Sequence, residues 1–145
     1  MKRIFKIITK YLFLFGIGGG VYILIELLYR GYSHWTMFIL GGLSFVLVGI
    51  LNEFYTWKMP IELQMLIGGG TITLLELVMG IIVNINLCWD IWDYSDMPFN
   101  FMGQICLTFS LMWILLSGVI IVVDDYIRYL LFDEEKPVYR SILIR

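Results

Sequence analysis

The sequence is poor in the residues that bind metals, form disulfide frameworks or attract nucleic acids. Its 145 residues include two cysteines and one histidine, charged residues make up 15%, and the net charge is −2. A zinc site needs several cysteine or histidine ligands, and nucleic-acid binding needs a basic surface. We therefore expect no metal site, no cofactor and no nucleic-acid partner. A disulfide between Cys88 and Cys106 is one option, but their expected positions favour two free, packed thiols.

Hydrophobic residues are the abundant class, at 60% of the chain. They form four continuous apolar stretches, each meeting the requirement of about 17–25 residues for a membrane-spanning helix. Strands of a membrane barrel would be shorter and would alternate in polarity. The sequence therefore predicts an all-α, polytopic membrane protein with four transmembrane helices, at Tyr11–Tyr29, Trp35–Leu51, Ile61–Leu87 and Phe99–Val123.

The basic residues indicate how these helices are oriented. Nine of the ten lysines and arginines fall on one side of a four-span topology, and Arg30 alone falls on the other. Basic residues are enriched in cytoplasmic loops, so we expect both termini in the cytoplasm. The chain then divides into a four-helix transmembrane domain, residues 1–125, and a cytoplasmic tail, residues 126–145. The start of the tail either continues the last helix or lies along the membrane surface as an interfacial helix.

An internal repeat is predicted between the first and third spans. Ile17–Leu27 and Ile67–Leu77, 50 residues later, share a triple glycine and a glutamate, and seven of their eleven positions match. Glycines at close spacing let neighbouring membrane helices approach each other. Two helix hairpins related in this way would share a pseudo-two-fold axis along the membrane normal, and Glu26 and Glu76 would face a common centre.

Both glutamates are expected about 22 Å into a hydrocarbon core about 30 Å thick. An ionisable group at this depth is a functional candidate because its burial is costly, although Glu26 and Arg30, one turn apart, could simply neutralise each other. Asn100, Gln104 and Thr108 add a polar stripe at helical spacing to the start of the fourth span. The candidate substrate-binding or ion-binding residues are Glu26, Arg30, His34, Glu76, Asn84, Asp93, Asn100 and Gln104. We expect Glu26, Glu76, Asn100 and Gln104 to line one cavity near the outer face, with Arg30 and His34 at its rim.

Four segments carry a resemblance to a known family: Gly31–Met37, the pair Gly41-Gly42, the pair Asn52-Glu53 and, most specifically, Trp92–Cys106. With these the chain resembles, from about Gly16 to Asp125, the putative ABC-transporter type IV (CmpB-like) family of small bacterial membrane proteins. The resemblance implies a permease in the bacterial plasma membrane. It supplies no defined substrate and no catalytic residue.

Two classes of function remain open. As a transport component, the chain would bind a cation, a proton or a polar substrate at the two glutamates. Four helices are too few to enclose a large pathway, so a homo-oligomer or a larger assembly in the lipid bilayer would form it. The sequence has no phosphate-binding lysine loop, so an ATP-driven role needs a separate ATPase subunit.

As a membrane enzyme, the chain would act on a lipid or isoprenoid substrate with a carboxylate as general acid or base. A subunit that only scaffolds others would need no polar centre. We favour transport, and the sequence leaves open whether the protein is an enzyme.

The topology yields the first prediction. In a chain without its two native cysteines, a thiol reagent outside intact cells should label Ser95→Cys and should not label Ser141→Cys, because position 95 is expected outside and position 141 in the cytoplasm. Labelling after permeabilisation is the control for accessibility. External labelling at position 141 would overturn the four-span model.

Overall fold

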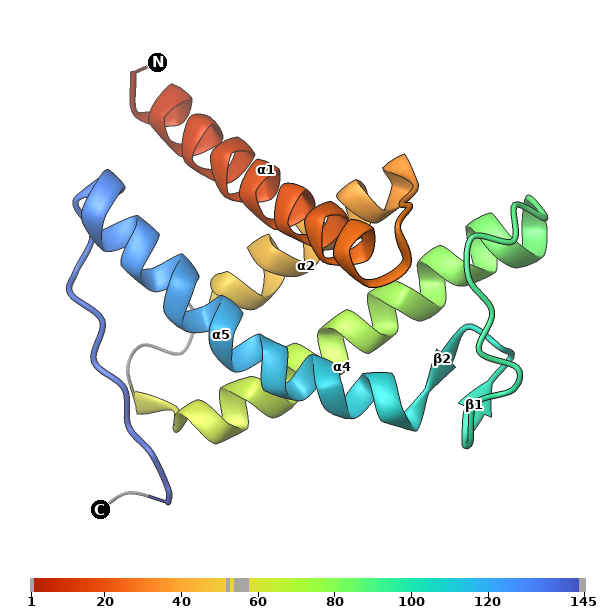
Figure 1. Ribbon diagram of the computed structural model, residues 1–145. Coiled ribbons are helices and arrows are strands. Elements are labelled where there is room, and N and C mark those ends of the chain that lie inside the picture. Colours follow the sequence, from red (N-terminus) through yellow and green to blue (C-terminus); the bar gives the residue numbers. More distant parts are fainter. Residues whose placement is uncertain (1, 52, 54–57, 144–145) are drawn as a thin grey trace.

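The computed structural model describes residues 2–51, 53 and 58–143, and Figure 1 shows them as a helical bundle with a short hairpin at one end. Asn52 of the family motif and Arg145 of the basic set lie outside the described residues. The short strands β1 and β2 are antiparallel, and Asn100 pairs with Cys106. The elements in chain order are α1 (Lys2–Arg30), α2 (Trp35–Gly49), α4 (Ile61–Gly80), the π-helical segment η2 (Ile81–Asn86), β1 (Asn100–Phe101), β2 (Ile105–Cys106) and α5 (Leu107–Phe132).

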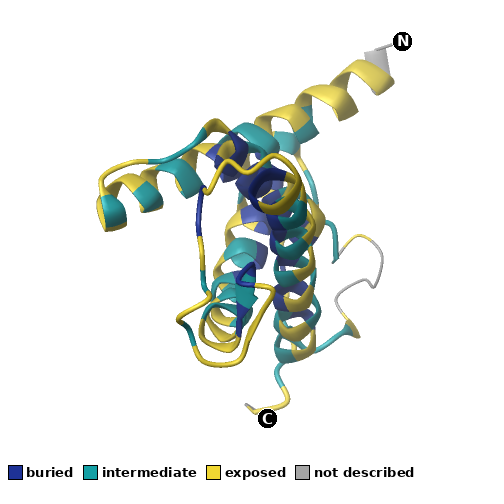
Figure 2. Cartoon of the chain, turned by 90° about the vertical axis from the view of Figure 1, so that its right-hand side faces the viewer, coloured by how far each residue is buried: buried dark blue, intermediate teal, exposed yellow. Residues whose placement is uncertain are grey.

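The all-α membrane fold is confirmed. Three of the described helical segments are long and apolar enough to cross a membrane, at Ile4–Arg30, Ile61–Asn86 and Leu107–Phe132. The fourth, α2, is apolar but has 15 residues, or about 22 Å of helix, so it is shorter than the expected span. Many large apolar residues are exposed, as expected where lipid is the solvent, and Figure 2 shows how exposed positions follow the helices.

The predicted start of the fourth span is wrong. Residues 99–106 form a turn and the β1–β2 hairpin, and the helix begins only at Leu107. The Asn100 side chain donates hydrogen bonds to the carbonyl oxygens of Ser95 and Met97, at 3.0 and 2.9 Å, and accepts one from the Gly103 amide. Gly103 has φ +67°, and an added Cβ there would lie 2.6 Å from the Ser95 hydroxyl. These side-chain hydrogen bonds favour a turn over a helix, so the helix begins later than the apolar composition of the segment predicts.

The last helix continues past the expected boundary and ends at Phe132. The segment that follows returns to the beginning of α4, where the Ile61 amide donates to the Arg140 carbonyl at 2.8 Å. Glu62 accepts hydrogen bonds from the Ser141 hydroxyl and from the amide of Ile142. Both cysteines are free; Cys106 is buried, whereas Cys88 is exposed and therefore not packed as expected.

Glycines determine how the helices pair. Helix α1 packs mainly on α2, α4 packs mainly on α5, and α2 contacts both members of the second pair. A Cβ atom on Gly19 would lie 2.5 Å from the Phe38 carbonyl oxygen, and one on Gly69 would lie 2.7 Å from the Ile114 amide nitrogen. Each glycine triplet therefore lets its helix approach the backbone of the next helix, as small residues do in membrane proteins. The internal repeat itself remains a prediction.

The glycine contacts yield the second prediction. Gly19→Leu and Gly69→Leu should each lower the free energy of unfolding by at least about 1–3 kcal/mol, because the new side chain overlaps the backbone of the facing helix. Thermal unfolding in detergent measures this. Gly20→Leu and Gly70→Leu are the matched controls, since a Cβ at either position has nothing within 4 Å. Equal stability of test and control variants would remove the packing role of the triplets.

Candidate functional site

Asn84 connects the end of the third span to the loop and hairpin that follow it. It lies in η2, where the Leu87 amide bonds the Ile82 carbonyl five residues back. Asn84 is 8% exposed. Its amide donates to the Trp92 carbonyl at 3.0 Å and to Gln104 Oε1 at 2.8 Å, and its oxygen accepts from the Ile91 amide at 2.8 Å. A π-helical turn often marks a functional position, and here it holds the buried amide toward the loop.

Gln104 belongs to the hairpin rather than to the predicted helix, and its side chain reaches Asn84. It lies against Gly80, where an added Cβ would be 2.4 Å from Gln104 Oε1. Its backbone carbonyl accepts a hydrogen bond from Trp92 Nε1 at 3.0 Å. Gly80 therefore provides the space in which this buried side chain meets Asn84.

Glu76 is the most buried of the predicted site residues, at 1% exposure. Its carboxylate accepts hydrogen bonds from the Tyr94 hydroxyl at 3.1 Å and from Trp113 Nε1 at 2.9 Å. These donors come from the loop and from α5, and both are uncharged. Among the described residues, no lysine or arginine forms an ion pair with Glu76.

The loop residue Tyr94 is held as a hydrogen-bond donor. Burial, followed by the charge of Glu76, raises the pKa of its hydroxyl above the ordinary value. Its ring stacks on Phe109, with centroids 4.8 Å apart. Tyr94 therefore stays protonated over the physiological range and keeps its hydrogen bond to Glu76.

Glu26 has a different environment, because it is paired with a cation. Arg30 Nη2 lies 2.6 Å from one carboxylate oxygen, and the Ser33 hydroxyl donates to the other at 2.5 Å. Arg30 also donates to the Ile91 carbonyl at 3.0 Å, which attaches α1 to the loop. Arg30 therefore neutralises Glu26 locally, which is a structural role for this glutamate.

The remaining predicted residues lie at the same end of the bundle but outside this buried group. His34 caps α2, with Nδ1 2.9 Å from the Thr36 hydroxyl, and its ring lies 5.5 Å from each of the Trp35 and Trp89 rings. Asp93 is exposed and accepts from the hydroxyl and amide of Ser95, which lower the pKa of its carboxyl. Asn100 is exposed and serves the hairpin turn.

An apolar groove of about 180 Å³ lies beside this group, and neither glutamate lines it. A cavity shared by the two glutamates therefore stays a prediction. Tyr22 of α1 stacks on Trp113, the donor to Glu76, with ring centroids 6.0 Å apart.

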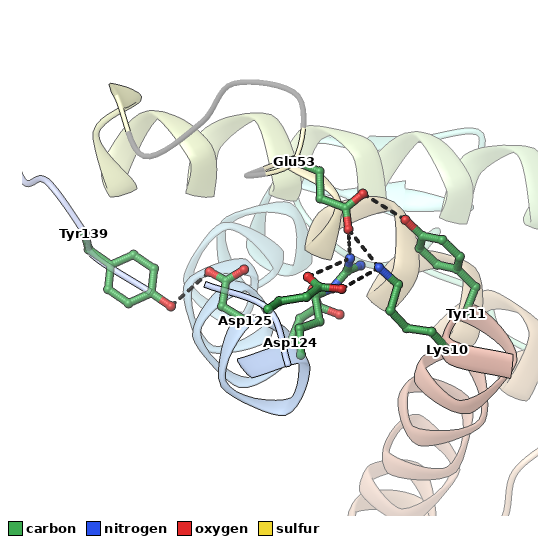
Figure 3. Close-up of polar contacts among 8 residues, drawn as sticks. Lys10, Tyr11, Glu53, Asp124, Asp125 and Tyr139 are labelled. Atoms are coloured by element: carbon green, nitrogen blue, oxygen red, sulfur yellow. Dashed lines mark hydrogen bonds and ion pairs between the residues drawn. The ribbon is translucent and has the colours of Figure 1, made fainter. Parts of the chain in front are cut away.

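A second polar group, which we call the Arg128 cluster, lies at the end of the bundle away from the hairpin (Figure 1). Figure 3 shows Lys10, Tyr11, Glu53 and Asp124 of this cluster pointing toward one another. Arg128 is 2% exposed, and its Nε lies 2.5 Å from Oδ2 of Asp124, which is 0% exposed. Arg128 also bonds Glu53, and Lys10 bonds Glu53 at 3.2 Å and Glu134 at 2.6 Å. The members of the cluster are Lys10, Tyr11, Glu53, Asp124, Arg128 and Glu134.

The Arg128 cluster was not predicted from the sequence. A visible signal was the four-residue spacing of Asp124 and Arg128, which places them on one helix face, but these residues were assigned to the end of the last span and to the tail. Gly49 provides space for the acid, because a Cβ there would lie 2.3 Å from Asp124 Cγ. Asp124 Oδ1 and Arg128 Nη2 have no hydrogen-bond partner among the described residues.

The comparisons with known proteins identify the family. The model of the family described as Putative ABC-transporter type IV matches residues 6–144, so the chain belongs to this family. No curated protein and no solved structure matches it. Within the described residues, no group of three or more histidine, cysteine, aspartate or glutamate residues is placed to hold a metal ion.

The Arg128 cluster yields the third prediction. Arg128→Gln should lower the free energy of unfolding by about 3–5 kcal/mol, because it leaves the buried Asp124 carboxylate without its cation. Adding Asp124→Asn to this variant should recover part of the loss, since no unpaired charge then remains at that position. Denaturant unfolding in detergent measures both, with exposed Arg140→Gln as the control. An equal loss in the control, or no recovery in the double variant, would contradict the ion-pair explanation.

Proposed function

We propose that this member of the putative ABC-transporter type IV family is the membrane-embedded component of a transport assembly, and that Glu76 is the residue at which it binds a proton or a cation. Family membership and the apolar helices support a role in a membrane transporter. The environment of Glu76 supports the assignment of the site.

The observation that carries the site proposal is the contrast between Glu76 and two other carboxylates of the bundle, Glu26 and Asp124. Glu26 and Asp124 each have an arginine within 2.6 Å. Among the described residues, the donors to Glu76 are two neutral groups. A carboxyl group that is buried in a membrane helix without a cationic partner is costly to keep, and such groups commonly mark proton or ion pathways.

The position of Glu76 suits a coupling role. One donor, Tyr94, lies in the loop that covers this end of the bundle, and the other, Trp113, lies in α5. A cation or proton on the carboxyl group would compete with or reorient both hydrogen bonds. Binding at Glu76 would therefore act on the loop and on α5 together.

The assembly needs more than one chain. Four helices are too few to enclose a large pathway, and no phosphate-binding lysine loop is present, so an ATP-driven role requires a separate ATPase subunit. We place the protein in the bacterial plasma membrane, with both termini cytoplasmic, as a homo-oligomer or as part of a larger assembly. The Glu76 end then faces outward.

An intramembrane enzyme acting on a lipid or isoprenoid substrate is the second candidate. The apolar groove favours it, because Trp113, the donor to Glu76, is part of the groove lining. A carboxyl group next to an apolar binding site is the arrangement that general acid–base chemistry on such a substrate would need.

The fourth prediction concerns Glu76→Gln. Gln keeps a carbonyl oxygen for Trp113 and offers its amide to the Tyr94 oxygen, so the fold should persist while the binding charge is lost. A ligand at 100 times its dissociation constant stabilises the folded state by about 2.7 kcal/mol. The melting temperature of the wild type should therefore change with Na⁺, K⁺ or pH, and the response of Glu76→Gln should be at least tenfold weaker.

The control for this prediction is Asp96→Asn, which removes an exposed carboxylate at the same end of the bundle. It should respond like the wild type. Proteoliposomes containing a pH-sensitive dye then test whether cation gradients drive proton movement that depends on Glu76. Identical responses of the wild type and Glu76→Gln to every cation and to pH would contradict the assignment of Glu76.

A further inference from the structure

The apolar groove lies between α1 and α5. Ile17, Val21 and Ile25 line it at four-residue spacing along α1, and Leu116, Val119 and Val123 line it on α5. Helix α1 packs mainly on α2 and α5 mainly on α4, so the two walls belong to different helix pairs. The floor comes from α2 and α4, through residues such as Phe45 and Ile72.

Side-chain contacts on either side of the groove connect α1 to α5 and to the segment that follows α5. Tyr22 stacks on Trp113 toward the hairpin end. Toward the other end, the Phe13 and Phe132 rings meet edge to face at 6.0 Å, and Lys10 of the Arg128 cluster bonds Glu134. Between these contacts the helices separate and leave about 180 Å³ of space.

We infer that this groove binds one hydrocarbon chain of a lipid-type amphiphile. An apolar cavity of about 150 Å³ is enough to take up a molecule such as benzene, so this groove has room for a short length of chain. One turn of a helix, about 10 Å wide and 5.4 Å high, occupies roughly 400 Å³. A transmembrane helix of a partner therefore cannot enter the groove as a whole.

The floor contains one polar group that lacks a partner. Ser44 is 4% exposed, and its hydroxyl has no hydrogen-bond partner among the described residues. A buried hydroxyl without a partner costs free energy. An ester or hydroxyl oxygen of an amphiphile is a group that this hydroxyl could bind, whereas a purely apolar helix face offers none.

The inference deepens the proposed function and rests on it for its role, because Trp113 belongs to the groove lining and also donates to Glu76. The ligand class assigned to the site is therefore an amphiphile with a hydrocarbon chain, bound next to the ion-binding carboxyl group. Binding of the chain itself does not require that Glu76 be charged.

Native mass spectrometry of the delipidated, full-length chain with added palmitoyl-oleoyl phosphatidylglycerol tests the inference. Val119→Trp places an indole in the groove, and Leu111→Trp places one on the same helix outside it. The two positions are matched, because Val119 is 58% exposed and Leu111 is 54% exposed. The wild type and Leu111→Trp should retain one lipid per chain with equal affinity, and Val119→Trp should bind it at least tenfold more weakly.

Three results would overturn the inference: no retained lipid in the wild type, equal binding by Val119→Trp, or a wild-type oligomer without lipid that Val119→Trp dissociates, which would make the groove an interface between copies. Glu76→Gln separates this inference from the proposed function. It should keep the lipid while losing the response to cations. Lipid binding that depends on Val119, together with an unchanged cation response in Glu76→Gln, would support the lipid site in the groove and contradict the proposed ion site.

Discussion

The absence of water inside a bilayer is the constraint on which this structure depends, because polar groups there must find partners within the protein. The chain gathers its buried charged and amide side chains at the two ends of the bundle. At one end, Asn84 forms hydrogen bonds with the loop backbone and with Gln104 of the hairpin. At the other end, Arg128 and Asp124 form a buried ion pair. Between the ends, glycines bring the helix backbones together. Gly49 and Gly80 combine close packing with the burial of polar groups, because each leaves the space that a buried polar side chain occupies.

Within this arrangement, the carboxylates differ in what neutralises them. Glu26 and Asp124 have arginines one turn further along their own helices, so their pairing forms as the helix forms. Glu76 has no such neighbour and depends on Tyr94 and Trp113, 18 and 37 positions away. The hydrogen bonds of the Glu76 carboxylate therefore depend on tertiary structure. A change in the loop or in α5 alters Glu76 first, whereas the arginine-paired acids keep their partners.

The sequence predicted the parts of the fold that depend on local composition. Apolar runs of membrane length gave the all-α class and most helix positions, and the spacing of Glu26 and Arg30 showed that they could pair. The fourth span was placed too early because the hydrogen bonds of Asn100 compete with helix formation in a segment that is still apolar. In the Arg128 cluster only Asp124 and Arg128 show a local spacing, and the other contacts join distant parts of the chain: Lys10 and Glu134 are separated by 124 positions. No local pattern records such a contact.

Trp113 explains why the groove and the carboxyl group should not act independently. Its ring forms part of the groove and stacks on Tyr22, and its Nε1 donates to Glu76. A chain that enters the groove meets the ring of Trp113, and a proton or cation on Glu76 changes the hydrogen bond of the same side chain. If each ligand favours one position of Trp113, then each must change the affinity of the other by the same factor. One indole in α5 would then link the proposed apolar ligand to the proposed ion.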